Sequence, residues 1–130
     1  TDFSDCSTAA VRYGLALAYM ETGDFEKARN EIAKLIAKYP RIGSFHIAAG
    51  KIEQRTNQYA AAVPHFERAY QLDPEGRAAV YNYVNGLLLV DRAREAKELL
   101  SRWGLSERRD PRFYKLMADA QTRLGDDSSA

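Results

Sequence analysis

The sequence predicts an all-α fold, a right-handed superhelical solenoid of antiparallel helix pairs. Three observations predict it: a pattern that returns every 34 residues, apolar residues at helical spacing inside each period, and turn-forming residues between the helical segments. Each period is long enough for two short helices, so the 130 residues hold three and a half repeats. Stacking such pairs buries a continuous core between neighbours, which a single pair cannot do.

The 34-residue period is clearest at the turns and at the small residues. Steps of 34 connect four turn formers, namely Gly23, Asn57, Asp91 and Gly125. The same step connects Ala28, Ala62, Ala96 and Ala130, and also Ala16, Gly50, Val84 and Ala118. Two helices in a tight hairpin approach closely where small residues face each other, so we expect Ala16 to face Ala28. In the second hairpin, Gly50 is expected to face Ala62.

The first two repeats predict four helices with recognisable boundaries. The helical pattern covers residues 9–22, 25–39, 43–56 and 59–72. Asp24 is predicted to be the N-cap of the second helix, and Pro40 to end it, because proline disfavours helical backbone in the preceding residue. Asp73 and Pro74 end the fourth helix in the same way. Pro64 removes one hydrogen bond early in that helix, so we expect a bend there.

The third and fourth repeats are less regular. Their predicted helices are 77–90, 92–103 and 111–124. Gly104 is predicted to follow the end of its helix, and residues 105–110 to form a longer loop. The segment Gly-Asp-Asp at 125–127 is predicted to be a turn, in which the two aspartates cap a helix that would follow.

We interpret the chain as a fragment of a larger protein that is cut inside a repeat. Residues 1–8 are predicted to form a polar leader or linker, and residues 9–130 the repeat domain. The repeats are 9–42, 43–76, 77–110 and the partial repeat 111–130. A solenoid without its terminal cap exposes an apolar face. We therefore expect the last helix to fray, or to self-associate with another molecule beside Leu116 and Leu124.

Composition argues against several classes of function. The formal net charge of +1 gives no electrostatic reason to bind nucleic acid or an anionic membrane. No apolar run approaches the length that spans a bilayer. Cys6 is the only cysteine, so an internal disulfide is impossible. His46 and His65 fall on different predicted helices without the spacing of a ligand pair, so neither a metal site nor a catalytic residue is predicted.

The first two repeats carry a family signature. The second repeat shows it at Ala49, Gly50, Tyr59, Ala62, Phe66, Ala69, Asp73 and Pro74, and the first at Leu15, Ala16, Tyr19, Gly23, Asp24, Phe25, Ala28 and Pro40. On these residues the chain resembles the tetratricopeptide repeat family over residues 9–130. In the third repeat Ala93 replaces an aromatic residue, and the closing proline is displaced. The resemblance implies the fold but says little about function.

Both ends of the chain resemble the repeat region of one class of enzyme. AVRYGLALAYMETGDFEKA (10–28) and DPRFYKLMADAQTRLGDDSSA (110–130) are similar to the C-terminal repeats of bacterial zinc metallopeptidases of the beta-barrel assembly-enhancing protease type. This resemblance implies a periplasmic location, a role in outer-membrane protein quality control, contact with outer-membrane assembly machinery, and zinc in the parent chain. The catalytic motif H-E-x-x-H is absent here, so these residues are predicted to be no enzyme and to hold no cofactor.

A row of positions on the first helix of each pair is the candidate binding surface. The row recurs at i, i+4 and i+8, and reads Tyr13, Leu17, Glu21; Ile47, Lys51, Arg55; Tyr81, Asn85, Leu89; and Lys115, Asp119, Arg123. The predicted binding residues are Tyr13, Leu17, Ile47, Lys51, Arg55, Tyr81, Asn82, Asn85, Arg112 and Lys115. Apolar anchors beside amide and cationic groups suit an extended peptide or a partner's helix.

Other interpretations of these side chains stay open. Tyr13 and Tyr81 equally suit packing between neighbouring repeats, because tyrosine serves core edges as well as interfaces. The cations of the row, taken singly, suit a solvated surface. Some domains of the family grip a chain-terminal carboxylate, but Ile47 and Leu116 stand where that clamp needs cations, so it is not predicted.

The leading interpretation is a protein–protein interaction module that binds client or partner polypeptide in its concave groove, as the accessory domain of a periplasmic zinc metallopeptidase. A second interpretation is a structural scaffold that packs against another domain of its own chain. A third is a general tetratricopeptide adaptor unrelated to proteolysis, for which the cytoplasm is an open location. Neither nucleic acid binding nor membrane insertion is predicted.

Overall fold

The computed structural model describes residues 2–103 and 111–128, with the side chains of residues 8–102 and 111–125. These residues form seven helices and no strand. The helices are α1 (Asp2–Thr22), α2 (Phe25–Lys38), α3 (Gly43–Arg55), α4 (Tyr59–Leu72), α5 (Arg77–Leu89), α6 (Ala93–Trp103) and α7 (Pro111–Ser128). The predicted all-α class is confirmed.

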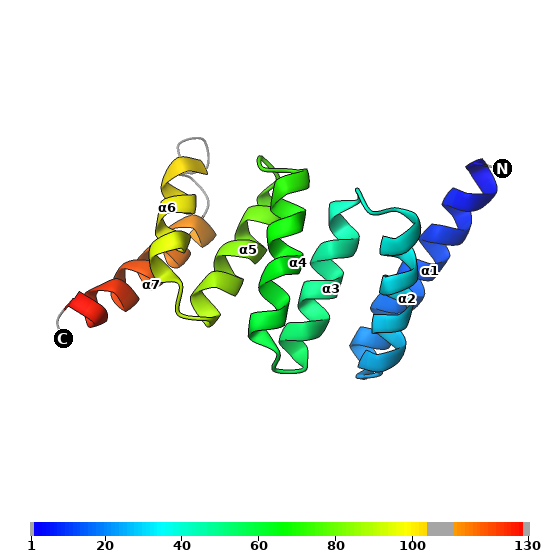
Figure 1. Ribbon diagram of the computed structural model, residues 1–130, viewed down its shortest axis with the longest axis horizontal. Helices are drawn as coiled ribbons and strands as arrows, with labels where there is room; N and C mark the ends of the chain where they lie inside the picture. The colour runs from blue at the N-terminus through cyan, green and yellow to red at the C-terminus, as the bar shows by residue number, and fades with distance from the viewer. Residues whose placement is uncertain (1, 104–110, 129–130) are drawn as a thin grey trace.

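The helices are arranged as a row of hairpins, with the two ends of the chain at opposite ends of the row (Figure 1). α1 packs on α2, α3 on α4, and α5 on α6, and each second helix also packs on the first helix of the next pair. The odd-numbered helices contact one another along the row, whereas α2, α4 and α6 make no such contacts among the described residues. The row therefore curves with the odd-numbered helices on its inner side.

The turns repeat the 34-residue period in their backbone angles. Gly23, Asn57 and Asp91 all have positive φ, at 84°, 62° and 62°. This left-handed conformation is uncommon for residues other than glycine, and asparagine and aspartate are the side chains that tolerate it best. Equivalent residues thus reverse the chain between the two helices of each complete pair, as the sequence predicts.

The buried residues form two clusters, one around α1 to α3 and one around α4 to α7, and Phe66 of α4 is fully buried in the second. A Cβ atom added to Gly50 of α3 would lie 2.7 Å from Cζ of the Phe66 ring, and one added to Gly86 of α5 would lie 3.0 Å from its Cδ2. The ring therefore occupies the space that side chains at both glycines would need. The sequence predicts that Gly50 faces Ala62, but the nearest atoms to a side chain there belong to Phe66, and this ring is the large neighbour that requires a glycine.

Both ends of the chain differ from the prediction. α1 begins at Asp2, so the predicted start of the first helix at residue 9 is wrong, whereas the division into a leader and a repeat domain stays a prediction. α7 continues to Ser128, so the turn predicted at 125–127 is wrong. No second helix packs back on α7 in the described chain, and glycine inside an exposed helix costs only about 1 kcal/mol.

Two residues of the second helices concern local predictions, Asp24 at the start of α2 and Pro64 within α4. Asp24 stands at the N-cap position of α2, but its side chain makes no capping hydrogen bond and instead accepts one from the Thr22 hydroxyl at 3.3 Å. Asp24 is therefore the N-cap residue as predicted, without a hydrogen bond from its side chain to the helix. Pro64 lies inside α4, which runs from Tyr59 to Leu72, and the bend there stays a prediction. The loop predicted at 105–110 and the role of Gly104 lie outside the described residues.

Candidate functional site

The inner face is the surface formed by α1, α3, α5 and α7, and it carries the predicted binding row. These helices lie side by side because each contacts the next odd-numbered helix. Four-residue spacing places each trio of the row along one side of its helix. The described structure therefore brings residues from four separated segments into one surface, which is what a groove for a long ligand requires.

The part of the inner face on α1 and α3 is mixed in character. Leu17 of α1 is 39% exposed, and Lys51 of the neighbouring helix α3 is also exposed. Arg55 donates a hydrogen bond to the Met20 carbonyl oxygen at 3.3 Å, which joins the C-terminal ends of α1 and α3. The Tyr13 ring packs against Phe45 with centroids 5.3 Å apart, and burial raises the pKa of its hydroxyl.

The part of the inner face on α5 and α7 is held together by a cation–π contact. The Arg112 guanidinium lies 4.8 Å from the centroid of the Tyr81 ring, and Tyr81 is only 7% exposed. Such a contact is worth about 0.5–1 kcal/mol at an exposed site. Asn82 donates to the Ala78 carbonyl oxygen at 2.8 Å, within its own helix. Asn85 lies on the same helix and is exposed.

The ten predicted residues divide into two groups. Exposed side chains belong to Leu17, Lys51, Arg55, Asn85, Arg112 and Lys115. Partly or fully buried side chains belong to Tyr13, Ile47, Tyr81 and Asn82. The three large apolar side chains expected to anchor a ligand, those of Tyr13, Ile47 and Tyr81, thus mainly pack against neighbouring residues. The binding role of all ten residues stays a prediction.

Leu89 supplies apolar surface that the set of ten omits. It is 40% exposed, close to the value for Leu17. It belongs to the i, i+4, i+8 row, so the spacing contained the signal, but the equivalent positions in the other repeats are the charged residues Glu21, Arg55 and Arg123. Arg123 forms an ion pair with Asp91 at 3.5 Å, which connects α7 to the turn before α6.

Both histidines are at least partly buried among other protein groups. His46 is buried, and its Nε2 donates to the Pro40 carbonyl oxygen at 2.8 Å. Burial lowers the pKa of His65, because the charged imidazolium loses hydration there. Within residues that the structure describes, no three His, Cys, Asp or Glu side chains gather as metal ligands. In the same residues, no helix has both the length and the apolar character of a membrane span.

Comparisons with protein families cover most of the chain. Two family models, each described as a tetratricopeptide repeat, match residues 13–77 and residues 55–120. An N-terminal acetyltransferase A complex subunit-like protein of Schizosaccharomyces pombe is 30% identical over 70% of this chain. Cell division cycle protein 27 homolog A of Arabidopsis thaliana is 32% identical over 68% of this chain. The matched region spans 13% of the length of each of these curated relatives.

Solved structures of low sequence identity have the same fold. The Sgt2 TPR domain from Aspergillus fumigatus is 13% identical, with a TM-score of 0.83 over 95% of this chain and 83% of that one. The first TPR of Spaghetti (RPAP3), bound to an HSP90 peptide, is 16% identical, with a TM-score of 0.80 over 90% and 93%. The chaperone SycD of Yersinia enterocolitica, in complex with a peptide of the translocator YopD, is 20% identical, with a TM-score of 0.73 over 92% and 91%. These similarities confirm the predicted solenoid fold.

Proposed function

The chain belongs to the tetratricopeptide repeat family, and we propose that its inner face binds a segment of a partner polypeptide without chemical change. One observation carries the proposal: exposed Leu17 and Leu89 share that face with the exposed amide of Asn85 and the exposed cation of Lys51. Leucines bury the apolar side chains of a peptide, whereas amides and ammonium groups hydrogen-bond its backbone carbonyls or carboxylates.

The similar structures support a polypeptide as the ligand class. The first TPR of Spaghetti holds an HSP90 peptide, and SycD holds a peptide of YopD. The exposed charges of the binding row include the cations Lys51, Arg55 and Lys115 and the acids Glu21 and Asp119. Since these cations outnumber the acids, the inner face favours a segment that carries carboxylates. These groups stand on packed helices that are already ordered. Binding a segment therefore costs little conformational entropy of the protein.

We also propose a finer assignment, as the accessory domain of a periplasmic zinc metallopeptidase that recruits client polypeptides in outer-membrane protein quality control. Its support is the resemblance at residues 10–28 and 110–130. Sequencing the parent gene on both sides tests it. An upstream H-E-x-x-H behind a signal peptide agrees with this assignment. If only further repeats or an unrelated domain appear, the assignment fails and a general adaptor is left.

The inner-face proposal is tested by site-specific photo-crosslinking in the source organism. A photoreactive benzoylphenylalanine replaces Lys51 or Asn85 on the inner face, or Lys34 on the exposed side of α2 as a matched control. We expect the same partner to be crosslinked from both inner positions and not from the control. Crosslinks of equal yield from Lys34, or none from the inner positions in a folded protein, would contradict the proposal.

A scaffold function is the second candidate, and exposed apolar residues on the two end helices, α1 and α7, favour it. Val11 is 70% exposed on α1, with Leu15 one turn further along the same side, and Tyr114 is 54% exposed on α7. Such residues suit packing against another domain. Replacing Val11 and Leu15 with Ser should leave partner capture unchanged if the inner face binds. Loss of capture in this variant, with the inner-face variants unaffected, would instead favour the scaffold.

A further inference from the structure

The outer side of the molecule carries two equivalent clefts of unequal size. The first outer cleft lies between α2 and α4 over α3 and has a volume of about 440 Å³, with a lining that includes Ile32, Ala33, Ile36, Ala37, Ala49 and His65. The second outer cleft lies between α4 and α6 over α5 and has a volume of about 250 Å³. Most lining residues of the second lie 34 positions beyond those of the first, so the two clefts occupy the same place in successive repeats.

Two tyrosine side chains line the second outer cleft and reduce its volume. The rings of Tyr70 and Tyr83 lie 5.5 Å apart there, and the Tyr83 hydroxyl donates to Glu67 at 3.1 Å. The residues 34 positions earlier are Ile36, Ala49 and Ala33. No ring occupies the equivalent space in the first cleft, because an isoleucine and an alanine replace the two tyrosines. The first cleft is therefore a mostly apolar site of larger volume, and in the next repeat two tyrosine side chains stand at the equivalent positions.

Three arginines lie on or near the first outer cleft, and two of them have no acidic partner among the described residues. Arg29, on its wall, donates to Glu53 at 2.9 Å and also contacts Glu26, so its charge is balanced inside the protein. Arg41 and Arg68 are exposed, and neither forms an ion pair with any residue in the described part of the chain, although Arg68 donates a long hydrogen bond to Gln71 Oε1 at 3.5 Å.

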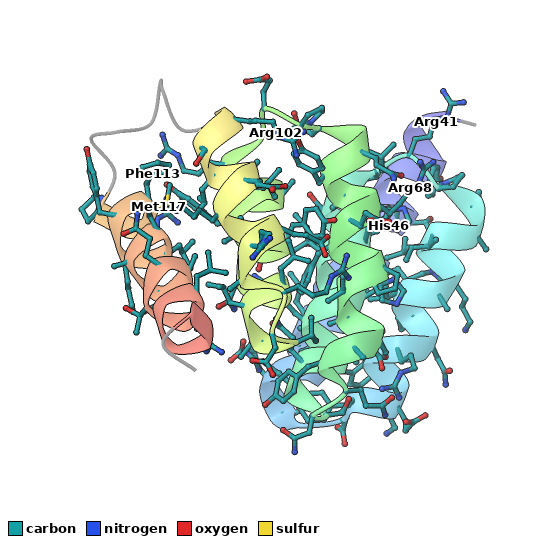
Figure 2. The ribbon with its side chains drawn as sticks, turned by 60° about the vertical axis from the view of Figure 1, so that its left-hand side comes forward. Arg41, His46, Arg68, Arg102, Phe113 and Met117 are labelled. Carbon is teal, nitrogen blue, oxygen red and sulfur yellow. The ribbon has the colours of Figure 1, made fainter. Side chains whose placement is uncertain are left out.

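Arg41 and Arg68 lie toward the C-terminal ends of α2 and α4, the two helices that border the cleft. Figure 2 shows both residues in the upper part of the molecule, on the same side as His46. The contact between the segments agrees with this view, since a Cβ atom on Gly43 would lie 3.9 Å from the Ala69 carbonyl oxygen. Guanidinium groups bind carboxylates in a forked geometry, so this end of the cleft complements an acidic group.

We propose that the first outer cleft is a second binding site, for a partner polypeptide that inserts one aromatic side chain and places flanking carboxylates on Arg41 and Arg68. The ring takes the volume that tyrosines fill in the next repeat. Its contacts are Ile36, Ala49 and Ile52, and the acidic flanks supply the charge that the arginines lack. The site is on the opposite side of the helices from the inner face and does not depend on it.

A titration followed by nuclear magnetic resonance tests the proposal. The probe is a synthetic acetylated peptide with one phenylalanine between two pairs of glutamates, added to the ¹⁵N-labelled chain. We expect amide shifts at Ala33, Ala37 and Arg68. Replacing the phenylalanine with alanine, or the glutamates with lysines, should weaken binding at least tenfold. Shifts confined to inner-face amides such as those of Lys51, or no shifts at millimolar peptide, would overturn the proposal.

Two variants of the chain sharpen the test. Ala37→Glu places a carboxylate on the exposed rim of the cleft, and we expect it to weaken the peptide at least tenfold. Ala18→Glu, on an exposed position of α1, is the matched control and should bind as the wild type does. The double variant Ile36→Tyr with Ala49→Tyr copies the second cleft and should also lose binding. If the double variant does not fold, Ala37→Glu decides, and its binding the peptide as tightly as the wild type would overturn the proposal.

Discussion

The hairpin α3–α4 and the terminal helix α7 carry equivalent residues in different surroundings. Gly50 of α3 is buried against the Phe66 ring, whereas Ala118, 68 positions further along, is exposed on α7. Phe113 of α7 is buried, and Figure 2 shows it with Met117 between α7 and α6. α7 is thus covered on the side that meets the preceding pair, and it is open on the side that a hairpin partner covers in α3.

The difference shows that a position in the repeat must hold a small residue only where a neighbouring helix packs closely against it. At Gly50 the neighbour is an aromatic ring, so the absence of a side chain is necessary. At Ala118 no described residue covers the position, so the same place in the repeat tolerates larger side chains. The repeated sequence pattern is necessary for the fold, but the burial of each position depends on its neighbours.

The largest effect is expected from emptying the centre of the α3–α4 hairpin. Phe66→Ala removes a fully buried ring that contacts α3 and α5, and should cost about 3–5 kcal/mol of unfolding free energy. Tyr114→Ala on the open side of α7 is the control and should cost less than about 0.5 kcal/mol. Urea unfolding followed by circular dichroism measures both. Equal losses would show that α7 is covered as completely as α4.

The next effect compares the equivalent small positions directly. Gly50→Val forces a side chain into the Phe66 ring and should cost about 1–3 kcal/mol through overpacking. Ala118→Val should change the unfolding free energy by only about 0.5 kcal/mol, through helix propensity. Thermal and urea unfolding of the pair give the answer. A cost at residue 118 that matches the cost at residue 50 would mean that a partner covers α7 in solution.

Amide hydrogen exchange should show the same difference without a mutation. We expect the amides of α7 at 111–124 to exchange at least about tenfold faster than those of α3 and α4, because one side of α7 lacks packing. Sedimentation must first show a monomer. Equal protection in a monomer would contradict the account, whereas protection that rises with concentration would support the predicted pairing beside Leu116 and Leu124.

The smallest effect concerns Tyr83 in the second outer cleft. Burial, with a smaller contribution from its hydrogen bond to Glu67, raises the pKa of Tyr83 to about 12. An unfolded tyrosine loses its proton near about pH 10. The stabilisation is therefore fully present below pH 10 and is lost as the pH rises towards 12. Tyr83→Phe should lose less stability over this interval. Identical pH profiles for the two proteins would show that the hydroxyl is solvated.

The sequence predicts most of the fold because its boundaries depend on local chemistry. Residues 59–72 form a helix with the predicted bounds, and 25–39 differs from α2 by one residue, since prolines and left-handed turn residues fix those ends. The two ends of the chain are less predictable. The turn at Gly23 is followed by a second helix that packs back on the first. No such helix follows Gly125 in the described chain, and α7 continues through it.

The binding row stays a prediction, and the structure adds the exposure of its side chains, which the sequence does not predict. Spacing within one helix places the row on the inner face. Burial of Tyr81 depends on Arg112, which lies 31 residues away in another helix, and local spacing contains no information on that contact. The first outer cleft cannot be predicted from local spacing, for a similar reason. It appears only when Ile36 and Ala49 are compared with Tyr70 and Tyr83, and the pairs meet across different helices.

The most direct test of the central claim is a map of where a crosslinked partner binds. The shortest segment of that partner that still binds is titrated into the ¹⁵N-labelled chain, and the amide shifts are assigned by residue. We expect the largest shifts on α1, α3, α5 and α7, around Leu17, Lys51 and Asn85. Shifts concentrated on α2, α4 and α6, with the odd-numbered helices unchanged, would contradict the proposal that the inner face binds.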